Sequence, residues 1–326
     1  MTNSNLQPSG VLVSILIINY NYGRFLGDAI NSALNQTYYH TEVIVVDDGS
    51  TDDSRAVIEA YGDQIVPVFQ ENGGQASAFN AGWRAAKGEI ICFLDSDDTF
   101  YPDKVKRCVD LIERYRADHP LILVSHSMDI IDQAGNFSGH IRKTQLSQYS
   151  AYTGFYDFAQ KYRYVPFVTS PTSGNVITQS LAERIFPIPE VGVKTSADDF
   201  VIKASLMLGK VLNVDDSLGK YRIHGQNYWA NGLRKAKTKD FMLLQERFLN
   251  EKLVENHLEP VISYLDSMGA APYHKMYGSE LSYLKLGLKV LLNRPDSRTF
   301  RFFKKSFKVT LKNLVKKLVG IKNPSL

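Results

Sequence analysis

The sequence contains very little cysteine and no long hydrophobic run. Its 326 residues include two cysteines, Cys92 and Cys108, which are too few for a disulfide framework or a cysteine-based zinc site. The longest apolar runs have the length of a strand, as at residues 15–18, whereas a membrane-spanning helix needs about 18 apolar residues or more. We therefore exclude a disulfide-rich domain and a membrane-spanning helix, and we expect a reducing compartment.

The first ten residues also lack the basic stretch and apolar core of a secretory signal, and for this reason we expect a cytoplasmic protein. Hydrophobic residues make up 44% of the chain and charged residues 22%, proportions that exclude fibrous and largely disordered proteins. The length suits a large α/β domain with a smaller region appended to it.

A surplus of positive charge lies at the C-terminal end. The formal net charge is +4, yet residues 298–326 contain nine Lys or Arg and no acidic residue, so the rest of the chain is mildly acidic. A nucleic-acid-binding protein concentrates its basic residues on the folded body. We therefore expect no nucleic acid among the partners.

The first third of the chain alternates between strand and helix patterns. Continuous apolar runs are typical of strands buried on both faces of a parallel sheet, and helical spacing of apolar residues follows them. Strands are predicted at 11–18, 42–46, 65–69 and 89–94, and helices at 24–36, 76–87 and 102–116. Another helix is expected between a cap at Ser50 or Thr51 and a stop at Gly62. This alternation predicts a parallel sheet covered by helices.

The pattern is less regular further along the chain. A strand is predicted at 121–125, a helix at 197–208 and a strand at 211–214, and the chain beyond Asn231 has an almost entirely helical pattern. We expect a domain boundary near 225–235.

Three polar clusters follow predicted strands. Residues 19–23 read Asn-Tyr-Asn-Tyr-Gly, residues 47–50 read Asp-Asp-Gly-Ser, and residues 95–98 read Asp-Ser-Asp-Asp. Any one of them alone is ordinary turn chemistry. Because ligands bind beyond the carboxyl ends of the strands in open parallel sheets, three clusters at one edge predict a ligand site.

The cluster at 95–98 brings three carboxylates together, which is costly unless a cation compensates their charge. A calcium EF-hand beginning at Asp95 would need Gly and Glu where this chain has Phe100 and Lys106. Mg²⁺ or Mn²⁺, held by one or two carboxylates and by the phosphates of a nucleotide, fits better. The dinucleotide G-x-G-x-x-G fingerprint, the Walker phosphate loop, H-E-x-x-H and G-x-S-x-G are all absent, which argues against dehydrogenase, Walker-type ATPase, zinc protease and serine hydrolase chemistry.

Four motifs, in this order and spacing, resemble family 2 glycosyltransferases of the GT-A fold. They are the apolar strand 13–18 with Asn-Tyr-Asn after it, the segment 45–52 ending in Asp-Asp-Gly-Ser-Thr-Asp, Asn72-Gly73-Gly74 leading to Asn80, and 88–98 ending in Phe-Leu-Asp-Ser-Asp-Asp. The resemblance covers residues 11–108 and continues more loosely to 227. It implies a GT-A-type, mostly parallel sheet flanked by helices, followed by a helical C-terminal region.

The resemblance also implies a donor site for a nucleotide sugar, expected to be a UDP-sugar. Asp48 would lie at the base or ribose, and the cofactor Mn²⁺ or Mg²⁺ on the diphosphate would be held by Asp97, Asp98 and His224. The residues implied to bind the nucleotide sugar are Asn19, Tyr20, Tyr22, Asp48, Gly74, Asn80, Asp95, Ser96 and Arg222.

The second half is implied to bind the acceptor and to supply a catalytic base. Pro171–Asn175 looks like the acceptor-side segment of the family, and Ser196–Phe200 is similar to its acidic pair at a helix start. Asp199 would be the base, with Asp198 beside it. A structural interpretation stays open, because Ser196 and Asp199 have the spacing of a helix capping box.

Tyr221–Asn227 resembles the family segment that closes over the diphosphate. Arg222 would neutralise phosphate charge and His224 would join the metal ligands, although a lone histidine is also common in a structural setting. Two features depart from the family. Phe79 precedes Asn80 where relatives often carry Arg, so one expected phosphate or sugar contact is missing from the pattern.

The second departure concerns processive synthases, whose Gln-x-x-Arg-Trp signature does not follow Asp199. Gln160 and Arg163 have that spacing, but they precede Asp199 and are followed by Tyr164. We therefore expect a single-addition transferase.

The C-terminal segment predicts a basic amphipathic helix. Phe307, Leu311, Leu314 and Leu318 recur at helical spacing with lysines between them. Such a helix either packs on the body or docks on an anionic membrane, where each nearby Lys or Arg contributes about 1 kcal/mol. A membrane contact through 298–326 would suit a lipid-linked acceptor.

The sequence thus predicts an inverting, metal-dependent glycosyltransferase that moves a sugar from a nucleotide-diphosphate sugar to a hydroxyl of a sugar or lipid-linked acceptor, in polysaccharide or glycoconjugate synthesis. We expect a GT-A catalytic domain at 1–228, with a donor half at 11–108 and an acceptor half at 109–228, and a helical region at 229–326. One alternative is a sugar nucleotidyltransferase, which would need a Gly-rich basic loop where 19–24 supply one Gly and one Arg. The other is a non-catalytic module that binds the donor without releasing nucleotide.

Overall fold

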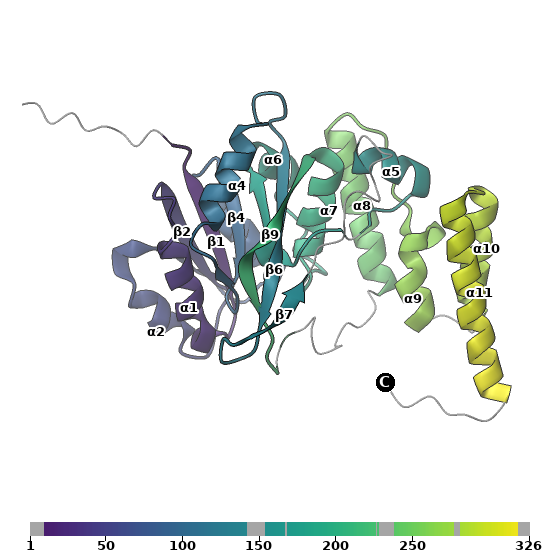
Figure 1. Cartoon of the computed structure of the whole chain (residues 1–326), viewed down its shortest axis with the longest axis horizontal. Helices are drawn as coiled ribbons and strands as arrows, with labels where there is room; N and C mark the ends of the chain where they lie inside the picture. The colour runs from purple at the N-terminus through teal and green to yellow at the C-terminus, as the bar shows by residue number, and fades with distance from the viewer. Residues whose placement is uncertain are drawn as a thin grey trace, which may run out of the picture. The chain divides into compact units, whose positions relative to one another are not determined.

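The computed structural model describes residues 10–141, 154–166, 168–225, 227, 238–276 and 281–318. The chain divides into two compact units, which Figure 1 shows as an α/β part and a set of helices. The α/β unit comprises Met1–Gly154 and Phe167–Ala230, and the helical unit comprises Phe155–Pro166 and Asn231–Leu326. A short segment that the sequence assigns to the acceptor half therefore clusters with the C-terminal helices instead.

Four parallel strands form the first half of the sheet, in the order β3-β2-β1-β4. These strands are β1 (Val13–Asn19), β2 (Thr41–Asp47), β3 (Val66–Phe69) and β4 (Ile90–Asp95). The register aligns Asn19 with Asp47 and Ile18 with Asp95. The polar clusters that follow β1, β2 and β4 consequently begin at the same edge of the sheet.

The second half of the sheet is mixed, whereas the sequence predicted mostly parallel pairing. β8 runs antiparallel to both β4 and β6, and β5 runs antiparallel to β9, while β6 and β9 are parallel. These strands are β5 (Thr99–Phe100), β6 (Ile122–Ile131), β7 (Phe137–Ile141), β8 (Asn175–Thr178) and β9 (Lys210–Arg222). β6 and β9 extend well beyond the predicted strands at 121–125 and 211–214, because each continues to pair with the other past its apolar run.

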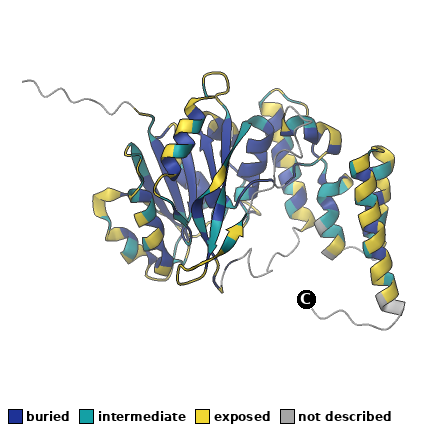
Figure 2. Ribbon diagram, in the orientation of Figure 1, coloured by how far each residue is buried: buried dark blue, intermediate teal, exposed yellow. Residues whose placement is uncertain are grey.

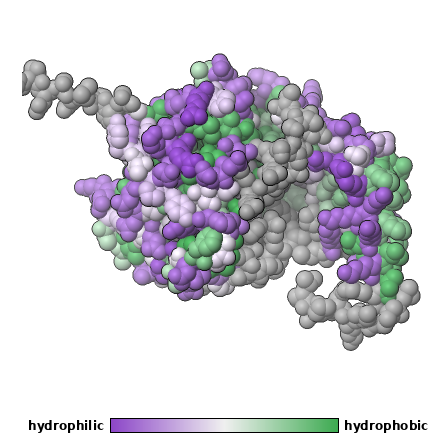
Figure 3. Space-filling view, in the orientation of Figure 1, coloured by the Kyte–Doolittle hydropathy of each residue, from purple (hydrophilic) through white to green (hydrophobic). Residues whose placement is uncertain are grey.

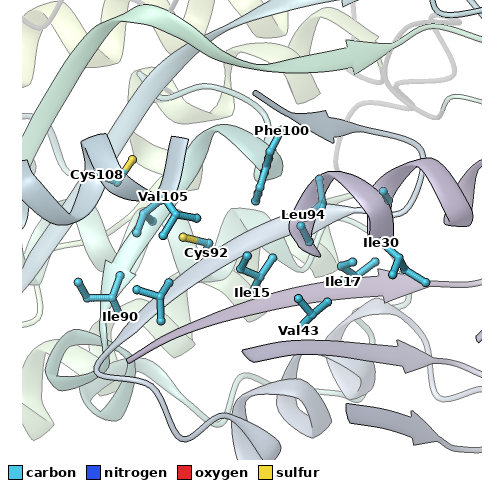
Figure 4. Packing of buried hydrophobic residues seen from close by; sticks show 14 of the residues in the cluster. Ile15, Ile17, Ile30, Val43, Ile90, Cys92, Leu94, Phe100, Val105 and Cys108 are labelled. Atoms are coloured by element: carbon cyan, nitrogen blue, oxygen red, sulfur yellow. The ribbon is translucent and has the colours of Figure 1, made fainter. Parts of the chain in front are cut away.

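Helices flank the sheet of the α/β unit (Figure 1). They are α1 (Gly23–Leu34), α2 (Ser54–Glu59), α3 (Gln75–Ala85), α4 (Lys104–Glu113), α6 (Gln179–Ile185) and α7 (Asp198–Leu208), with short 3₁₀ turns η1 (Gly62–Gln64) and η3 (Thr172–Gly174). The central strands are buried, as Figure 2 shows in dark blue. In the core between the strands and the helices, Ile15, Ile30 and Leu94 pack together with Cys92 and Cys108 (Figure 4), and both cysteines are free thiols.

The predicted cap of the second helix is wrong. α2 begins at Ser54, with Asp53 at its N-cap, and it ends at Glu59 before Gly62. The hydroxyl of Ser50 instead donates to the carboxylate of Asp47. Because this hydroxyl is hydrogen-bonded to Asp47 at the end of β2, it does not cap the helix N-terminus.

The helical unit contains α5 (Phe155–Tyr162), α8 (Lys239–Glu255), η4 (Tyr264–Asp266), η5 (Met268–Ala270), α9 (Ala271–Met276), α10 (Ser282–Asn293) and α11 (Ser297–Leu318). Asp296 lies between the last two helices and ties them to α5, since its carboxylate accepts a hydrogen bond from the Tyr162 hydroxyl at 2.8 Å. Within the described ranges, no helix has both the length and the apolar character needed to cross a bilayer.

Candidate active site

The loops that follow β1 and β2 are hydrogen-bonded to each other at the carboxyl edge of the sheet. The side-chain amide of Asn19 donates to Asp47 Oδ1 at 2.8 Å, and the backbone N–H of Asp48 donates to the carbonyl of Asn19 at 2.9 Å. Ser50 Oγ accepts the backbone N–H of Asn21 at 2.8 Å. Asn19 is completely buried, so it supports the edge from beneath, and its predicted contact with a donor stays a prediction.

The carboxylate of Asp48 is buried and hydrogen-bonded within the protein. Its Oδ1 accepts the Gly73 N–H at 3.0 Å and the Gln70 amide at 2.6 Å, and its Oδ2 accepts the Gly74 N–H at 2.8 Å. Gly74 has a φ of 87°, and a Cβ there would lie 2.9 Å from Lys194 Cα. Asp48 therefore fixes the shape of the loop before α3, and this loop conformation requires glycine at 74.

The side chain of Asn80, in α3, is hydrogen-bonded to the segment around 188–190. Its amide nitrogen donates to the carbonyl of Ile188 at 2.9 Å and to Glu190 at 2.8 Å, while its oxygen accepts the Ile188 N–H at 2.9 Å. The residue is buried. These bonds hold the segment around 188–190 against α3, and they lend no support to the predicted donor contact of Asn80.

Asp98 joins the acidic loop after β4 to two distant segments. Its Oδ2 accepts a hydrogen bond from the Ser173 hydroxyl at 2.6 Å, and its Oδ1 accepts the backbone N–H of Arg222 at 3.0 Å. The Ser173 oxygen also accepts the backbone N–H of Asp95 at 3.0 Å. Burial, and then the charges of Asp97 and Asp95, raise the pKa of Asp98 well above its usual range, although the two hydrogen bonds lower it. Asp98 is fully buried and its neighbour Ser96 nearly so.

Asp97 is the acid of this loop that contacts side chains of the segment after β9. Its Oδ2 lies 2.9 Å from Nε2 of His224 and 3.2 Å from the amide nitrogen of Asn227. The His224 ring contacts the rings of Tyr22, at 5.3 Å between centroids, and Phe25, at 4.9 Å. Residues that follow β1 and β4 thus both contact His224, in the segment that follows β9.

The tyrosines of the first loop differ in setting. Tyr20 is 46% exposed, whereas Tyr22 is partly buried beside the acidic loop. Burial, and then the charges of Asp97 and Asp95, raise the pKa of Tyr22 to about 12. Tyr22 therefore stays a neutral hydrogen-bonding group at physiological pH.

Arg222 is buried, and its guanidinium is bonded inside the protein. Nε donates to the carbonyl of Asp97 at 2.9 Å, one terminal nitrogen donates to the carbonyl of Gln133 at 3.2 Å, and the other to Asp28 at 2.9 Å. Its side chain is 5% exposed. These bonds make Arg222 a brace for the acidic loop, and its predicted contact with phosphate stays a prediction.

The acidic pair lies in the first turn of α7. Asp199 is buried, and its Oδ2 lies 3.0 Å from Nζ of Lys203, one turn further along the helix. The N-cap is Ala197 rather than Ser196, which has a φ of 62°, so the alternative of a capping box centred on Ser196 does not match the observed helix start.

The start of α7 also faces the acidic loop. Burial, and then the charges of Asp97 and Asp198, raise the pKa of Asp95 well above its usual range, while a hydrogen bond from Thr172 lowers it. The helix start is held in place because the backbone N–H of Ala197 donates to the side chain of Gln75 at 2.9 Å. The two groups of acids predicted from separate parts of the sequence therefore influence one another.

Sequence reasoning missed Lys203 and Gln75. It also missed that the Ser173 hydroxyl bridges Asp95 and Asp98. Lys203 could have been found, because a cation four residues after an acid is the spacing of a helical ion pair. Gln75 and the Ser173 bridge had no such signal, since their partners lie far away in the chain.

The donor atoms at this edge fit a hard cation only in part. Within the described residues, no three His, Cys, Asp or Glu side chains are grouped as a complete metal site. Asp97 and His224 supply two donors, next to carboxylates whose pKa values are raised partly by their mutual repulsion. Two protein donors suit Mg²⁺ or Mn²⁺ if phosphate oxygens and water fill the other positions.

Comparison with known proteins defines the class of the chain. Residues 14–174 match the family described as glycosyl transferase family 2. An uncharacterized glycosyltransferase of Nostoc sp. (strain PCC 7120) is 36% identical over 257 residues, which cover 74% of this chain and 76% of the relative. The chain therefore belongs to glycosyltransferase family 2, and it is a glycosyltransferase rather than a nucleotidyltransferase or a non-catalytic module.

One further relative matches over a shorter stretch, and a solved structure matches over most of the chain. Chondroitin synthase of Escherichia coli is 39% identical over 128 residues, which are 38% of this chain and 18% of that protein. A crystal structure of Staphylococcus aureus TarS 1–349 in complex with UDP-GlcNAc has a TM-score of 0.57 and 16% identity, and the match covers 92% of this chain and 88% of that one. At this identity the likeness concerns the fold, and it confirms the predicted GT-A-type α/β architecture with a helical C-terminal region.

Proposed function

We propose that this glycosyltransferase is an inverting, metal-dependent enzyme that moves a sugar from a nucleotide-diphosphate sugar to an acceptor hydroxyl. The main support is the convergence at one sheet edge of Asp97 with His224, at 2.9 Å, and of the α7 acids with Asp95, whose pKa responds to Asp198. Such a site has carboxylates that can hold a cation near the leaving group on one side. On the other side it has a carboxylate that can accept a proton from the acceptor.

The proposed donor is a UDP-sugar. TarS, whose fold this chain shares, is named in complexes with UDP and with UDP-GlcNAc. In the proposal, the loop fixed by Asp48 and the exposed Tyr20 receive the nucleoside, and the edge near Asp97 receives the diphosphate. The acceptor would be a sugar or a lipid-linked sugar, and the name of the chondroitin synthase relative favours polysaccharide or glycoconjugate synthesis. A cytoplasmic location stays a prediction.

Asp97 and His224 would hold the cation, with Asp98 and Arg222 fixing the loop that carries Asp97. A bound Mg²⁺ or Mn²⁺ supplies Lewis-acid stabilisation of the charge that develops on the departing nucleoside diphosphate. Before the donor binds, His224 and Asn227 keep the Asp97 carboxylate oriented through their contacts at 2.9 and 3.2 Å.

Asp199 would accept the proton of the acceptor hydroxyl. As that proton moves to the carboxylate, the acceptor oxygen forms a bond to the anomeric carbon, and the bond to the nucleoside diphosphate breaks on the opposite face with its electron pair going to the diphosphate. A single displacement of this kind inverts the anomeric centre. Lys203 would hold the Asp199 carboxylate in one orientation, and Asp198 would extend the acidic face toward Asp95.

A panel of nucleotide sugars with Mn²⁺ or Mg²⁺, scored for nucleotide release and for the anomeric configuration of the product, tests this function. The wild type is compared with Asp97→Ala and Asp199→Asn, and with Asp63→Asn as a matched surface control. We expect release with one donor class, loss in the first two variants and wild-type release in the control. Retention of configuration, or full activity of both site variants, would overturn the proposal.

A further inference from the structure

Exposed apolar side chains are concentrated in the last two described helices. Across the described residues, seventeen large hydrophobic side chains are exposed, and seven of them belong to α10, its preceding residue or α11. These seven are Leu281, Leu288, Leu292, Phe300, Phe307, Leu311 and Val315. A soluble surface tolerates scattered apolar residues, but such a cluster marks a contact surface.

The apolar residues lie in stripes. Along α11, the exposed residues from Phe300 to Val315 are spaced by seven, four and four positions, which places them on one side of the helix. Leu281, Leu288 and Leu292 have the same kind of spacing on α10. Figure 3 shows green residues gathered along one edge of this helix pair, beside a purple band.

The side of α11 that is buried carries small polar residues instead. Thr299, Ser306 and Thr310 are buried, and a Cβ at Gly287 of α10 would lie 2.1 Å from the Ser306 oxygen. The two helices therefore approach closely at Gly287 and Ser306, and the rings of Tyr283 and Phe302 also contact each other, at 5.7 Å between centroids. The exposed apolar residues of α10 and α11 are not among the buried positions of this contact, so the exposed stripes are not needed to hold the pair together.

Positive charge borders the apolar stripe. The exposed side chains of α11 include Arg301, Lys304, Lys305, Lys308 and Lys312, and α11 contains no acidic residue. A second copy of this surface would bring like charges together, which opposes self-association. An anionic surface that also accepts apolar groups matches both features.

We propose that the exposed face of α10 and α11, defined by the seven apolar residues and five basic residues named above, docks on an anionic lipid bilayer. α11 lies in the plane of the interface, with Phe307 and Leu311 among the acyl chains and the lysines at the headgroups, as amphipathic helices with this composition do. The inference goes beyond the proposed chemistry, because it depends on none of the active-site residues.

Vesicle partition of the full chain tests this inference. We would measure binding to vesicles of phosphatidylcholine with about 30% phosphatidylserine, and to vesicles of phosphatidylcholine alone, by co-sedimentation. The combined change of Lys304, Lys308 and Lys312 to Gln should lower binding to the anionic vesicles roughly 10²-fold, since each lysine is worth about fivefold. Phe307→Ser with Leu311→Ser should lower it by at least about 10²-fold.

Matched controls keep the test independent of folding and of catalysis. Phe137→Ser with Val191→Ser removes two apolar side chains from the α/β unit that are more exposed than Phe307 and Leu311, and changing Arg55, Lys87 and Lys106 to Gln removes three exposed charges there. Both should bind vesicles as the wild type does. Nucleotide release without vesicles should be unchanged in every variant, so a failure of docking is distinguishable from a failure of the proposed function.

Two results would overturn the inference. The first is equal binding, or no binding, to anionic and neutral vesicles by the wild type. The second is a wild-type dimer in sedimentation velocity that the Phe307 and Leu311 changes convert to a monomer, since that would assign the face to a second copy of the chain.

Discussion

Lys203 Nζ lies 3.0 Å from Asp199 Oδ2 across one turn of α7, and the two side chains are only 10% and 7% exposed. A carboxylate removed from water keeps its charge only with compensation. The ion pair therefore supplies compensation for a buried charge and the orientation that a base at this position needs.

Replacing Asp199 by Asn should reduce turnover roughly 10²- to 10⁴-fold and leave the apparent affinity for the donor nearly unchanged. Asparagine keeps the shape of the side chain but accepts no proton. Steady-state kinetics with saturating acceptor would measure both quantities. Turnover within a factor of a few of the wild type would remove Asp199 from the mechanism.

Replacing Lys203 by Met should destabilise the fold by about 3–5 kcal/mol, because it leaves a buried carboxylate without its cation. Adding Asp199→Leu should recover part of this loss, and urea unfolding of the single and double variants would measure the coupling. Lys106→Met is the matched control, since its pair with Asp110 is about half exposed and is worth about 1 kcal/mol or less. Similar losses for both lysines would contradict the interpretation.

Removal of divalent cations should abolish transfer, and Mn²⁺ or Mg²⁺ should restore it. His224→Gln should raise the metal concentration needed for half-maximal activity roughly 10- to 100-fold, because it removes one of the two donors at the edge. A metal titration of nucleotide release would show the shift. Activity that persists after exhaustive chelation would exclude the cation from the reaction.

Replacing Asp48 by Asn should destabilise the α/β unit by about 1–3 kcal/mol. The new amide nitrogen would face N–H groups that now donate hydrogen bonds to the carboxylate. The loop before α3 should loosen, and hydrogen exchange at Gly73 and Gly74 would report it directly. Asp53→Asn, an exposed change nearby, is the control. Unchanged exchange rates at both glycines would show that Asp48 does not hold this loop.

Lys104 is fully buried, with Nζ 3.2 Å from the centre of the Phe100 ring and without a hydrogen-bond partner among the described residues. Burial lowers its pKa below the usual 10.5, although Cys92 and Cys108 oppose the shift. Between the lowered value and 10.5 the unfolded chain binds more protons than the folded chain, so this residue makes stability rise with pH there.

Lys104→Met should therefore stabilise the protein at pH 7 by about 1–4 kcal/mol, and the gain should shrink as the pH rises toward 10.5. Urea unfolding of variant and wild type at several pH values measures the difference. A gain that is the same at every pH, or a loss at neutral pH, would refute this account.

The pattern of apolar and polar residues was sufficient to predict the strands in the first half of the sheet. β1, β2 and β4 are continuous apolar runs whose burial depends on local composition, and the polar residues after them lie at the carboxyl edge because parallel strands share a direction. Three of the family's four motifs lie on these strands and the loops after them, and the fourth lies at the start of α3, so the local pattern led to the class of enzyme.

The second half of the sheet and the contacts of the site residues depend on residues that are distant from each other in the chain. β6 and β9 are long because they pair with one another, and no local signal sets their ends. Asn80, Asp98 and Arg222 were predicted to meet a ligand, yet the side chain of each is hydrogen-bonded to a residue more than seventy positions away. Residue type alone does not distinguish a polar side chain that braces a loop from one that faces a substrate.

The hydroxyl of Ser173 links Asp98 and the backbone of Asp95, so the segment from Pro171 to Asn175 and the acidic loop share one geometry. If this segment contacts the acceptor as proposed, exchanging it is expected also to move the carboxylates of Asp95 and Asp98 unless a serine or threonine is retained at 173. Acceptor preference and donor activation are consequently expected to change together in such chimaeras, and libraries that vary 171, 172 and 174 around a fixed serine offer the best prospect of separating them.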